Sequence, residues 1–397
     1  MQEELINLNI NDFIEADELI KEEKDQKKLS LYMLFWSIML IIAGILAAII
    51  TKEGIKVIDN LLLLWLSPAK LVTDYFNLGS LGAAFLNAGL CGLGCNLMIF
   101  LTKAKKSSTL LAGYFLVIAH CFYGLNFLNM WLPFLSIFLY ALMSKKRLGD
   151  VLHLSMFATS LGPFISDFLF RYTLGDNFVF GSPKVTLVGI IIAVIFSIIA
   201  AFLIPALVNG VTKMHRGYNL YKAGVAIGLF GFFAFALFYK SFNISTPDTL
   251  IRNNDYYETH KNLHYLFSIS FFFIMFILSF IIGLKGNKWT LKGYEKLWKC
   301  DGWRDDFPIK FGMPLTIMNI GIYGMGLLVY YIVIMLLTNG TGFSGPTTGA
   351  IIAAITFSAS GQTIRNVWPI ACGYVIFSLF LYFQLFYQTH LKYSYEY

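Results

Sequence analysis

Charged residues are scarce in this sequence. Only 13% of its 397 residues are Asp, Glu, Lys or Arg, whereas soluble domains average roughly 25%. With 57% hydrophobic residues and a mean hydropathy of +0.66, the composition excludes a water-soluble enzyme. It also argues against nucleic acid as a partner, because the net charge of +7 comes from Lys and Arg in short clusters between apolar runs.

Cysteine and histidine are also rare, with 5 and 6 residues. Cys91, Cys95, Cys121 and Cys372 lie inside apolar runs, so we expect neither a disulfide framework nor a zinc site. The sequence has no Walker loop, no Gly-x-Ser-x-Gly and no His-Glu-x-x-His motif, which are signatures of ATP hydrolysis and of hydrolytic catalysis. We therefore expect no cofactor, no metal and no enzymatic activity.

Long apolar runs make up most of the chain. A helix needs about 20 apolar residues to cross roughly 30 Å of hydrocarbon. The sequence predicts an all-α, polytopic transmembrane helical bundle in the lipid bilayer, with about 9 to 11 membrane segments. The segments are 29–50, 81–102, 107–123, 129–143, 150–170, 185–209, 223–239, 265–284, 312–337, 344–358 and 367–387. The short segments 107–123, 129–143 and 344–358 either span the bilayer or are re-entrant.

The distribution of Lys and Arg predicts the orientation. Basic residues such as Lys27, Lys105 and Lys146 are about twice as frequent on the side of the membrane that holds the N-terminus. Cytoplasmic loops carry this excess, so we expect a multi-pass protein of the cell membrane with a cytoplasmic N-terminus.

One pattern occurs twice in the chain. Residues 74–94 begin with Asp and continue with Asn87 and three glycines, and residues 306–326 repeat these residue types at the same spacing around Asn319. A second block, Gly-x-x-x-x-Asn-x-Trp, contains Asn129 in its first copy and Asn366 in its second. Chance agreement over two blocks in the same order is improbable, so the sequence predicts an internal repeat.

The predicted segments also give the direction of the two copies. An odd number of crossings separates equivalent spans, which predicts two inverted-topology repeats of the kind found in many transporters. The predicted parts are a cytoplasmic N-terminal segment (1–28), a first membrane repeat (29–239), an extracytoplasmic loop (240–264) and a second, shortened membrane repeat (265–397).

The residues that carry these patterns resemble a family of bacterial multi-spanning membrane proteins known as domain of unknown function 1576. The matching stretches are Thr73–Tyr75, Ala84–Leu90, Leu161–Pro163, His215–Tyr221, Gly345–Thr347 and Gly361–Pro369. The resemblance implies a two-repeat, transporter-like protein without an assigned substrate. The second repeat lacks its own His-Gly-x-Asn-Leu-Tyr block, so a site that needs both blocks is half missing or is completed by a second subunit of a homo-oligomer.

Asn87 and Asn319 are the most prominent candidates for a binding site. A side-chain amide in an apolar span must find a partner, because an unpaired polar group in hydrocarbon costs several kcal/mol. One interpretation is that both amides line a path for a small polar solute near the middle of the membrane. The other is that they hold neighbouring helices together, next to glycines that allow close packing.

The remaining candidates lie near helix ends and interfaces. In the Gly-x-x-x-x-Asn-x-Trp blocks, we expect the glycine to end one helix and Asn129 or Asn366 to cap the next. Such a connection either exposes backbone N–H groups to a solute or is plain capping. The other candidates for substrate binding are Asp167 near a Gly-Pro break, the block with His215, Asn219 and Tyr221, and Thr347 in a Gly-rich, Pro-bearing stretch.

Two functions fit these features. The first is a channel or secondary transporter for a small polar molecule, which the paired Asn residues and the broken helices favour. The alternative is a membrane-embedded enzyme or sensor that acts on a lipid-linked or small-molecule ligand, with Asp167, His153 and His120 as the reacting groups. A polar cavity between the repeats would favour the transporter, whereas convergence of these three side chains at one membrane surface would favour the enzyme.

Overall fold

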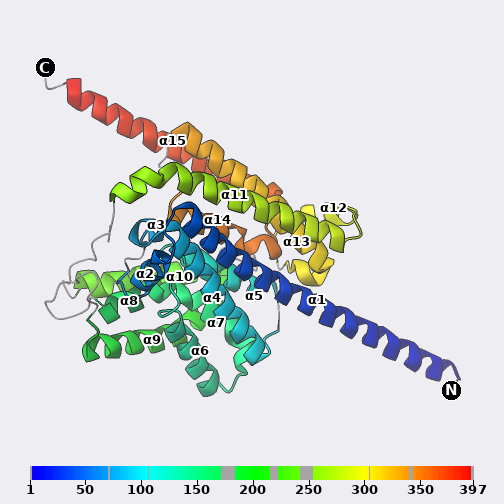
Figure 1. Cartoon of the computed structure of the whole chain (residues 1–397). Coiled ribbons are helices and arrows are strands. Elements are labelled where there is room, and N and C mark those ends of the chain that lie inside the picture. Colours follow the sequence, from blue (N-terminus) through cyan, green and yellow to red (C-terminus); the bar gives the residue numbers. More distant parts are fainter. Residues whose placement is uncertain are drawn as a thin grey trace.

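The computed structural model describes residues 2–69, 72–105, 107–170, 184–214, 222–241, 254–303, 305–338 and 343–394. All regular secondary structure in these ranges is helical, which confirms the predicted all-α class (Figure 1). The helices are α1 (Gln2–Ile50), α2 (Lys56–Trp65), α3 (Tyr75–Leu78), α4 (Leu81–Thr102), α5 (Ser108–His120), α6 (Trp131–Met143), α7 (Leu148–Ala158), η1 (Thr159–Leu161), α8 (Gly162–Phe170), α9 (Leu187–Met214), α10 (Lys222–Phe235), η2 (Ala236–Ser241), α11 (Asn254–Gly286), α12 (Tyr294–Trp298), α13 (Phe307–Thr338), α14 (Gly345–Ile355), η3 (Thr356–Ala359) and α15 (Ile364–Ser394).

Six of the described helical stretches are long and apolar enough to cross a membrane. They are Gln26–Ile50, Leu81–Thr102, Leu148–Phe170, Leu187–Val208, Thr259–Gly286 and Phe307–Leu337. The shorter apolar stretches are Ser108–His120, Trp131–Met143, Gly224–Tyr239, Gly345–Ala359 and Ile364–Phe377. Each predicted membrane segment coincides with one of these stretches, and together they indicate a multi-pass membrane protein.

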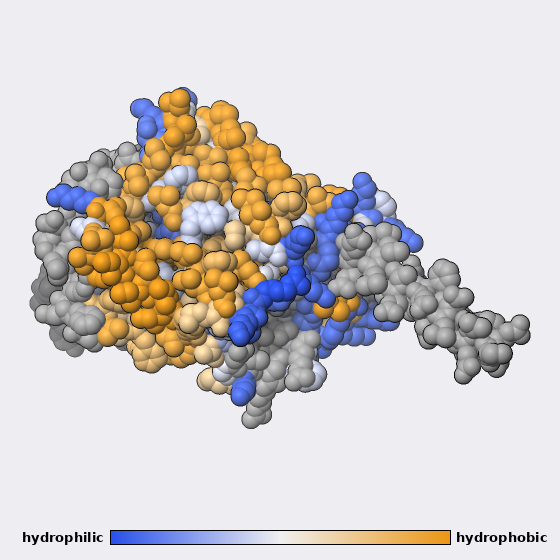
Figure 2. Space-filling model, turned by 90° about the horizontal axis from the view of Figure 1, so that it is seen from below, coloured by the Kyte–Doolittle hydropathy of each residue, from blue (hydrophilic) through white to orange (hydrophobic). Residues whose placement is uncertain are grey.

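The surface agrees with a bilayer environment. Figure 2 shows apolar residues over most of the visible face, with hydrophilic residues gathered toward its ends. Large apolar side chains such as Ile49, Phe100 and Phe273 are 65%, 78% and 49% exposed. A soluble protein rarely exposes so much contiguous apolar surface, whereas lipid covers it without cost.

Two pairs of long helices pack in the same manner. A Cβ atom at Gly89 of α4 would lie 2.9 Å from the amide nitrogen of Ile41 in α1. In the second pair, a Cβ atom at Gly321 of α13 would lie 2.5 Å from the amide nitrogen of Phe280 in α11. Only glycine permits these approaches, as expected for small residues at helix interfaces in membranes. Figure 1 shows that α1 and α11 run in opposite directions.

The main core lies where the two pairs meet. The Tyr32 hydroxyl of α1 shares a hydrogen bond of 2.8 Å with the Ser279 hydroxyl of α11. One turn further along α1, the fully buried Trp36 packs edge-on against Phe115 of α5, with ring centroids 5.1 Å apart. It also contacts Phe271 of α11 at 6.4 Å. This aromatic packing joins parts of the chain more than 200 residues apart in sequence.

Helices α7 to α10 form a second core beside α5 and α6. Its centre is aromatic and includes Phe164, Phe168, Phe196 and Phe230, with centroid distances of 5.3 to 5.7 Å between Phe196 and the other three.

One predicted boundary differs from the structure. Residues 240–264 were expected to form a loop between the repeats, but α11 already begins at Asn254. This polar first part continues directly into the apolar span, so the hydropathy pattern marks the start of the apolar segment and not the start of the helix.

Candidate functional site

The first Gly-x-x-x-x-Asn-x-Trp block breaks the chain between α5 and α6. Gly124 adopts a φ of 142°, which side-chain-bearing residues rarely reach. Asn126 and Asn129 then exchange hydrogen bonds, each side chain accepting from the other backbone N–H at 2.9 and 2.8 Å. This reciprocal pair is the arrangement of a capping box. The amide of Asn129 also donates to the Gly162 carbonyl and the Ser166 hydroxyl, which ties the break to α8.

The second block forms the same break between α14 and α15. Gly361 has a φ of 106°, and the Asn366 side chain accepts from the Thr363 backbone N–H at 2.9 Å. The Asn366 amide donates to the Gly361 carbonyl at 2.6 Å, as the Asn129 amide donates to the Gly124 carbonyl at 3.0 Å. The predicted capping role is corrected: Asn129 and Asn366 accept from the backbone N–H three positions earlier, and Asn129 does not cap α6, which begins at Trp131 after Met130 without a side-chain cap.

Asn87 anchors the first break from α4. Its side chain is 0% exposed, and its amide donates to the carbonyls of Cys121 and Leu125 at 3.0 and 2.9 Å. Its side-chain oxygen accepts from the indole N–H of Trp65 at 3.0 Å. The helix break leaves these two carbonyls without an intrahelical donor. The Asn87 amide supplies the missing hydrogen bonds, which lipid hydrocarbon cannot do.

Asn319 anchors the second break in the same way. Its buried amide donates to the carbonyls of Ser358 and Gln362 at 2.7 and 2.9 Å, and its oxygen accepts from the Tyr294 hydroxyl at 3.0 Å. Because the amide groups of both Asn87 and Asn319 are used within the protein, these contacts favour the helix-anchoring interpretation over the solute-binding one.

Two aspartates connect each copy to the helix start of the other. The Asp74 carboxylate accepts from the backbone N–H of Gly345, at the start of α14, at 2.9 Å. The Asp306 carboxylate accepts from the hydroxyl of Ser108, at the start of α5, at 2.6 Å. Ser108 and Gly345 each follow a serine that caps its helix by accepting from a backbone N–H three residues later. A carboxylate at a helix N-terminus also interacts favourably with the helix dipole.

Burial makes Asp74 an unusual carboxylate. It caps α3 by accepting from the Phe76 backbone N–H at 3.0 Å, and burial raises the pKa of its carboxyl above the usual value of 3.8. The backbone N–H groups of Gly345, Phe76 and Asn77 partly oppose this shift of the pKa, because they stabilise the charged form.

The other predicted site residues lie apart from the breaks or outside the described ranges. Asp167 is 2% exposed in α8 and accepts a short hydrogen bond from the Tyr239 hydroxyl. Thr347 lies in the first turn of α14, where its hydroxyl shares a hydrogen bond of 3.0 Å with the hydroxyl of the capping Ser344. The predicted block with His215, Asn219 and Tyr221 lies outside the described residues.

A cleft opens directly beside the first break. It has a volume of about 530 Å³ and lies between the end of α5, the η1 turn and α10. The polar side chains that line it are His120, Tyr123 and Ser160, and its other walls are apolar or glycine. The rings of His120 and Tyr123 pack edge to face with centroids 5.3 Å apart. Asp167, the carboxylate of the enzyme hypothesis, is not among the lining residues.

Neither Tyr123 nor Ser160 was a candidate from the sequence, and His120 was a candidate only as a reacting group of the alternative enzyme. A usable signal was present: Gly224, Gly228 and Gly231 lie on one face of the predicted span 223–239, and such a face marks either tight packing or an open space. For metals, the described residues contain no group of three His, Cys, Asp or Glu side chains placed to hold an ion.

Together, the fold and this geometry define a multi-pass, all-helical membrane protein with two broken helices. The chain belongs to the family described as protein of unknown function (DUF1576), which matches residues 53–240 and 286–392. The second matched block begins at the last residue of α11 and the first begins just after α1, so both follow the leading long helix of a copy. No curated protein and no solved structure matches the chain.

Proposed function

We propose that the protein is a channel or secondary transporter that moves a small molecule across the cell membrane by relative movement of two inverted repeats. The observation that carries the proposal is the exchange of contacts by Asp74 and Asp306, each of which binds the start of the broken helix in the other copy. Contacts exchanged in this manner are typical of two parts related by a two-fold axis.

The direction of the helices supports an axis in the membrane plane. Equivalent helices α1 and α11 run in opposite directions, as an inverted repeat requires (Figure 1). In transporters of this kind, one repeat rocks against the other around a site near the membrane midplane, where helices are discontinuous. The breaks after α5 and α14 supply two such discontinuous helices.

The two aspartate contacts are suited to act as gates on opposite sides. The Asp306 contact lies at the start of α5, because Ser108 is the first residue of this helix. The Asp74 contact lies near the other end, where the Phe122 carbonyl accepts from the backbone N–H of Tyr75, the neighbour of Asp74. An α-helix of 13 residues separates the two contacts, which corresponds to about 20 Å. Opening one contact while the other stays closed would give access to the interior from one side at a time.

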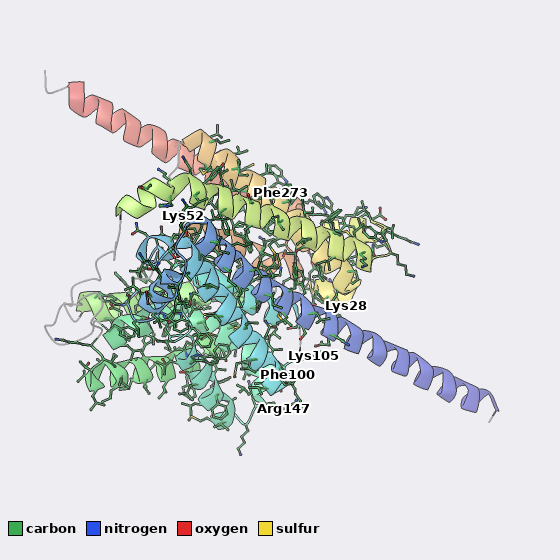
Figure 3. All side chains as sticks on the ribbon, in the orientation of Figure 1. Lys28, Lys52, Phe100, Lys105, Arg147 and Phe273 are labelled. Atoms are coloured by element: carbon green, nitrogen blue, oxygen red, sulfur yellow. The ribbon has the colours of Figure 1, made fainter. Side chains whose placement is uncertain are left out.

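Surface charge supports a cytoplasmic N-terminus. In Figure 3, Lys28, Lys105 and Arg147 lie toward the end of the bundle where the chain begins, and Lys52 lies toward the opposite end. Ser108, the partner of Asp306, is close to Lys105 in sequence. The Asp306 contact would then be the inner gate, and the Asp74 contact would be the outer gate.

A disulfide across one gate tests the proposal. Ser108→Cys and Asp306→Cys are combined in protein whose accessible Cys300 and Cys372 are replaced by Ser. The protein is reconstituted in liposomes loaded with a mixture of amino acids, sugars, nucleosides and small neutral aromatic amides, and the retained solutes are measured by mass spectrometry.

We expect the reduced protein to release at least one solute faster than empty liposomes, the oxidised pair to retain it, and reductant to restore release. Each single cysteine variant, treated with the same oxidant, is the control. The proposal fails if no solute leaves faster than from empty liposomes, or if the oxidised pair releases solute at the rate of the reduced protein.

A further inference from the structure

The cleft beside the first break has the size of a small-molecule site. Its volume of about 530 Å³ falls within the range of roughly 300 to 1,000 Å³ that is usual for ligand pockets. It runs along α10 from Gly224 to Phe235, which corresponds to about 17 Å of helix.

Glycines keep this cleft open. Gly224, Gly228 and Gly231 follow each other at intervals of four and three residues, so they share one face of α10. Among the described residues, a Cβ atom at Gly224 or Gly228 would meet nothing within 4 Å, and one at Gly231 would meet a Leu161 methyl at 4.0 Å.

These glycines differ from those that hold membrane helices together. At Gly89, a Cβ atom would lie 2.9 Å from a neighbouring backbone atom, which is the signature of close packing. Along α10 the glycine face is instead unoccupied, so close helix packing does not explain it.

The described residues that line the cleft offer hydrogen-bonding groups but no charged side chain. His120 lies at its wall with a half-buried side chain. The Ser160 hydroxyl donates to the Phe157 carbonyl at 2.8 Å, which leaves its oxygen free to accept from a ligand. The Tyr123 phenol completes the polar lining, while Leu116, Ile227, Phe232 and Phe235 are among the apolar walls.

The second copy of the pattern has no imidazole and no phenol at the matching positions. The positions that match His120 and Tyr123, counted from the glycine of each break, are Phe357 and Ser360. The cleft chemistry therefore is not required to form a break, because the second break forms without it.

We infer that this cleft binds a small neutral molecule with an apolar, preferably aromatic body and one hydroxyl or amide group. The apolar walls favour the body, the three polar side chains favour one hydrogen-bonding group, and the lack of a charged partner disfavours an ion in this low-dielectric site. The inference names the substrate class of the transport proposed above, but binding itself is testable without transport.

The test uses 4-fluorophenol as the probe, with the full-length protein in lipid nanodiscs and detection by fluorine NMR. Fluorobenzene lacks the hydroxyl and 4-fluorobenzoate is charged at neutral pH, so both are matched comparisons. Empty nanodiscs measure partition into lipid. We expect saturable binding of 4-fluorophenol, at least fivefold weaker binding of fluorobenzene and no saturable binding of 4-fluorobenzoate.

Variants then locate the site. Gly228→Leu fills the cleft and should abolish saturable binding, and His120→Phe should weaken binding of 4-fluorophenol at least fivefold without affecting fluorobenzene. Gly373→Leu in α15 is the control, because a Cβ atom there also meets nothing within 4 Å. If Gly228→Leu does not fold, Gly224→Leu replaces it.

The inference is overturned if 4-fluorophenol and fluorobenzene bind equally, which would indicate a site for lipid chains, or if binding survives in folded cleft-filling variants. It is also overturned if 4-fluorophenol only partitions as it does into empty nanodiscs. Saturable binding together with an absence of solute release in the gate experiment would refute the transport proposal and leave the binding site intact.

Discussion

Replacement of Asn87 by Leu separates the two interpretations of the paired asparagines. Asn87→Leu removes three hydrogen bonds, which the amide makes to the carbonyls of Cys121 and Leu125 and to the indole N–H of Trp65. At a net value of about 1 kcal/mol each, the loss is about 3 kcal/mol, and it is larger if the two carbonyls stay buried without donors.

This loss converts to a change in melting temperature. For a chain larger than 250 residues, we expect a shift of about 2 °C for each kcal/mol, hence a decrease of about 6 °C. Thermal unfolding in detergent, followed by tryptophan fluorescence, measures it. Asn319→Leu should give a similar decrease, because its amide makes the equivalent contacts to Ser358, Gln362 and Tyr294.

A matched control is available on the surface. Asn287→Leu removes two hydrogen bonds in an exposed turn, where water replaces the lost partners, so it should cost about 1 kcal/mol or less. The anchoring role is refuted if Asn87→Leu melts within 1 °C of the unaltered protein while solute release is lost. The asparagine would then act on the solute, as one of the two interpretations of the sequence predicts.

Three further predictions address charge, packing and orientation. Asp74→Asn keeps an acceptor oxygen for the N–H of Gly345 but removes a charge whose burial raises the carboxyl pKa. The unaltered protein should lose stability as the pH rises from about 3.8 through the raised pKa, because the buried carboxyl becomes charged. The variant should therefore have the higher melting temperature at pH 7.5, and the two melting temperatures should approach each other toward pH 4. A gap between the melting temperatures that grows on acidification contradicts this prediction. Gly349→Leu should lower the melting temperature by several degrees, because a Cβ atom there would lie 2.4 Å from the Ala119 carbonyl oxygen, and an unchanged value would argue against this packing. In intact cells, a membrane-impermeant maleimide should label Lys56→Cys and not Arg147→Cys, and the reverse pattern would invert the proposed topology.

The membrane segments were predictable because one physical signal dominates them. A run of about 20 apolar residues is readable without knowledge of its neighbours, and each predicted segment coincides with an apolar helix. The start of α11 at Asn254 was not predictable in this way, because its first turns are helical but polar, so hydropathy does not mark them. Backbone conformation and membrane burial are separate properties, and hydropathy reports only the second.

The sequence identified the paired asparagines but not their hydrogen-bond partners. The spacing identified Asn87 and Asn319 as members of one pattern, yet it gave no access to the broken-helix carbonyls that each amide binds. Those carbonyls lie more than 30 residues away in sequence, and only the fold brings them to the asparagine. The cleft was missed for a related reason. An open space between α5 and α10 forms where the fold places no side chain, and the sequence does not show this placement.

The pattern that occurs twice in the sequence separates residues that maintain the fold from candidates for function. Contacts present in both copies of the pattern, such as the asparagine anchors, are sufficiently explained by the need to satisfy backbone groups at two breaks. A residue that only one copy possesses has no such explanation. His120 is replaced by Phe357 at the equivalent break, and the break still forms, so the imidazole is not needed for the turn. A polar ring at the wall of an open cleft in an apolar bundle carries a desolvation cost that the turn does not require, which agrees with the ligand binding that we propose for this cleft.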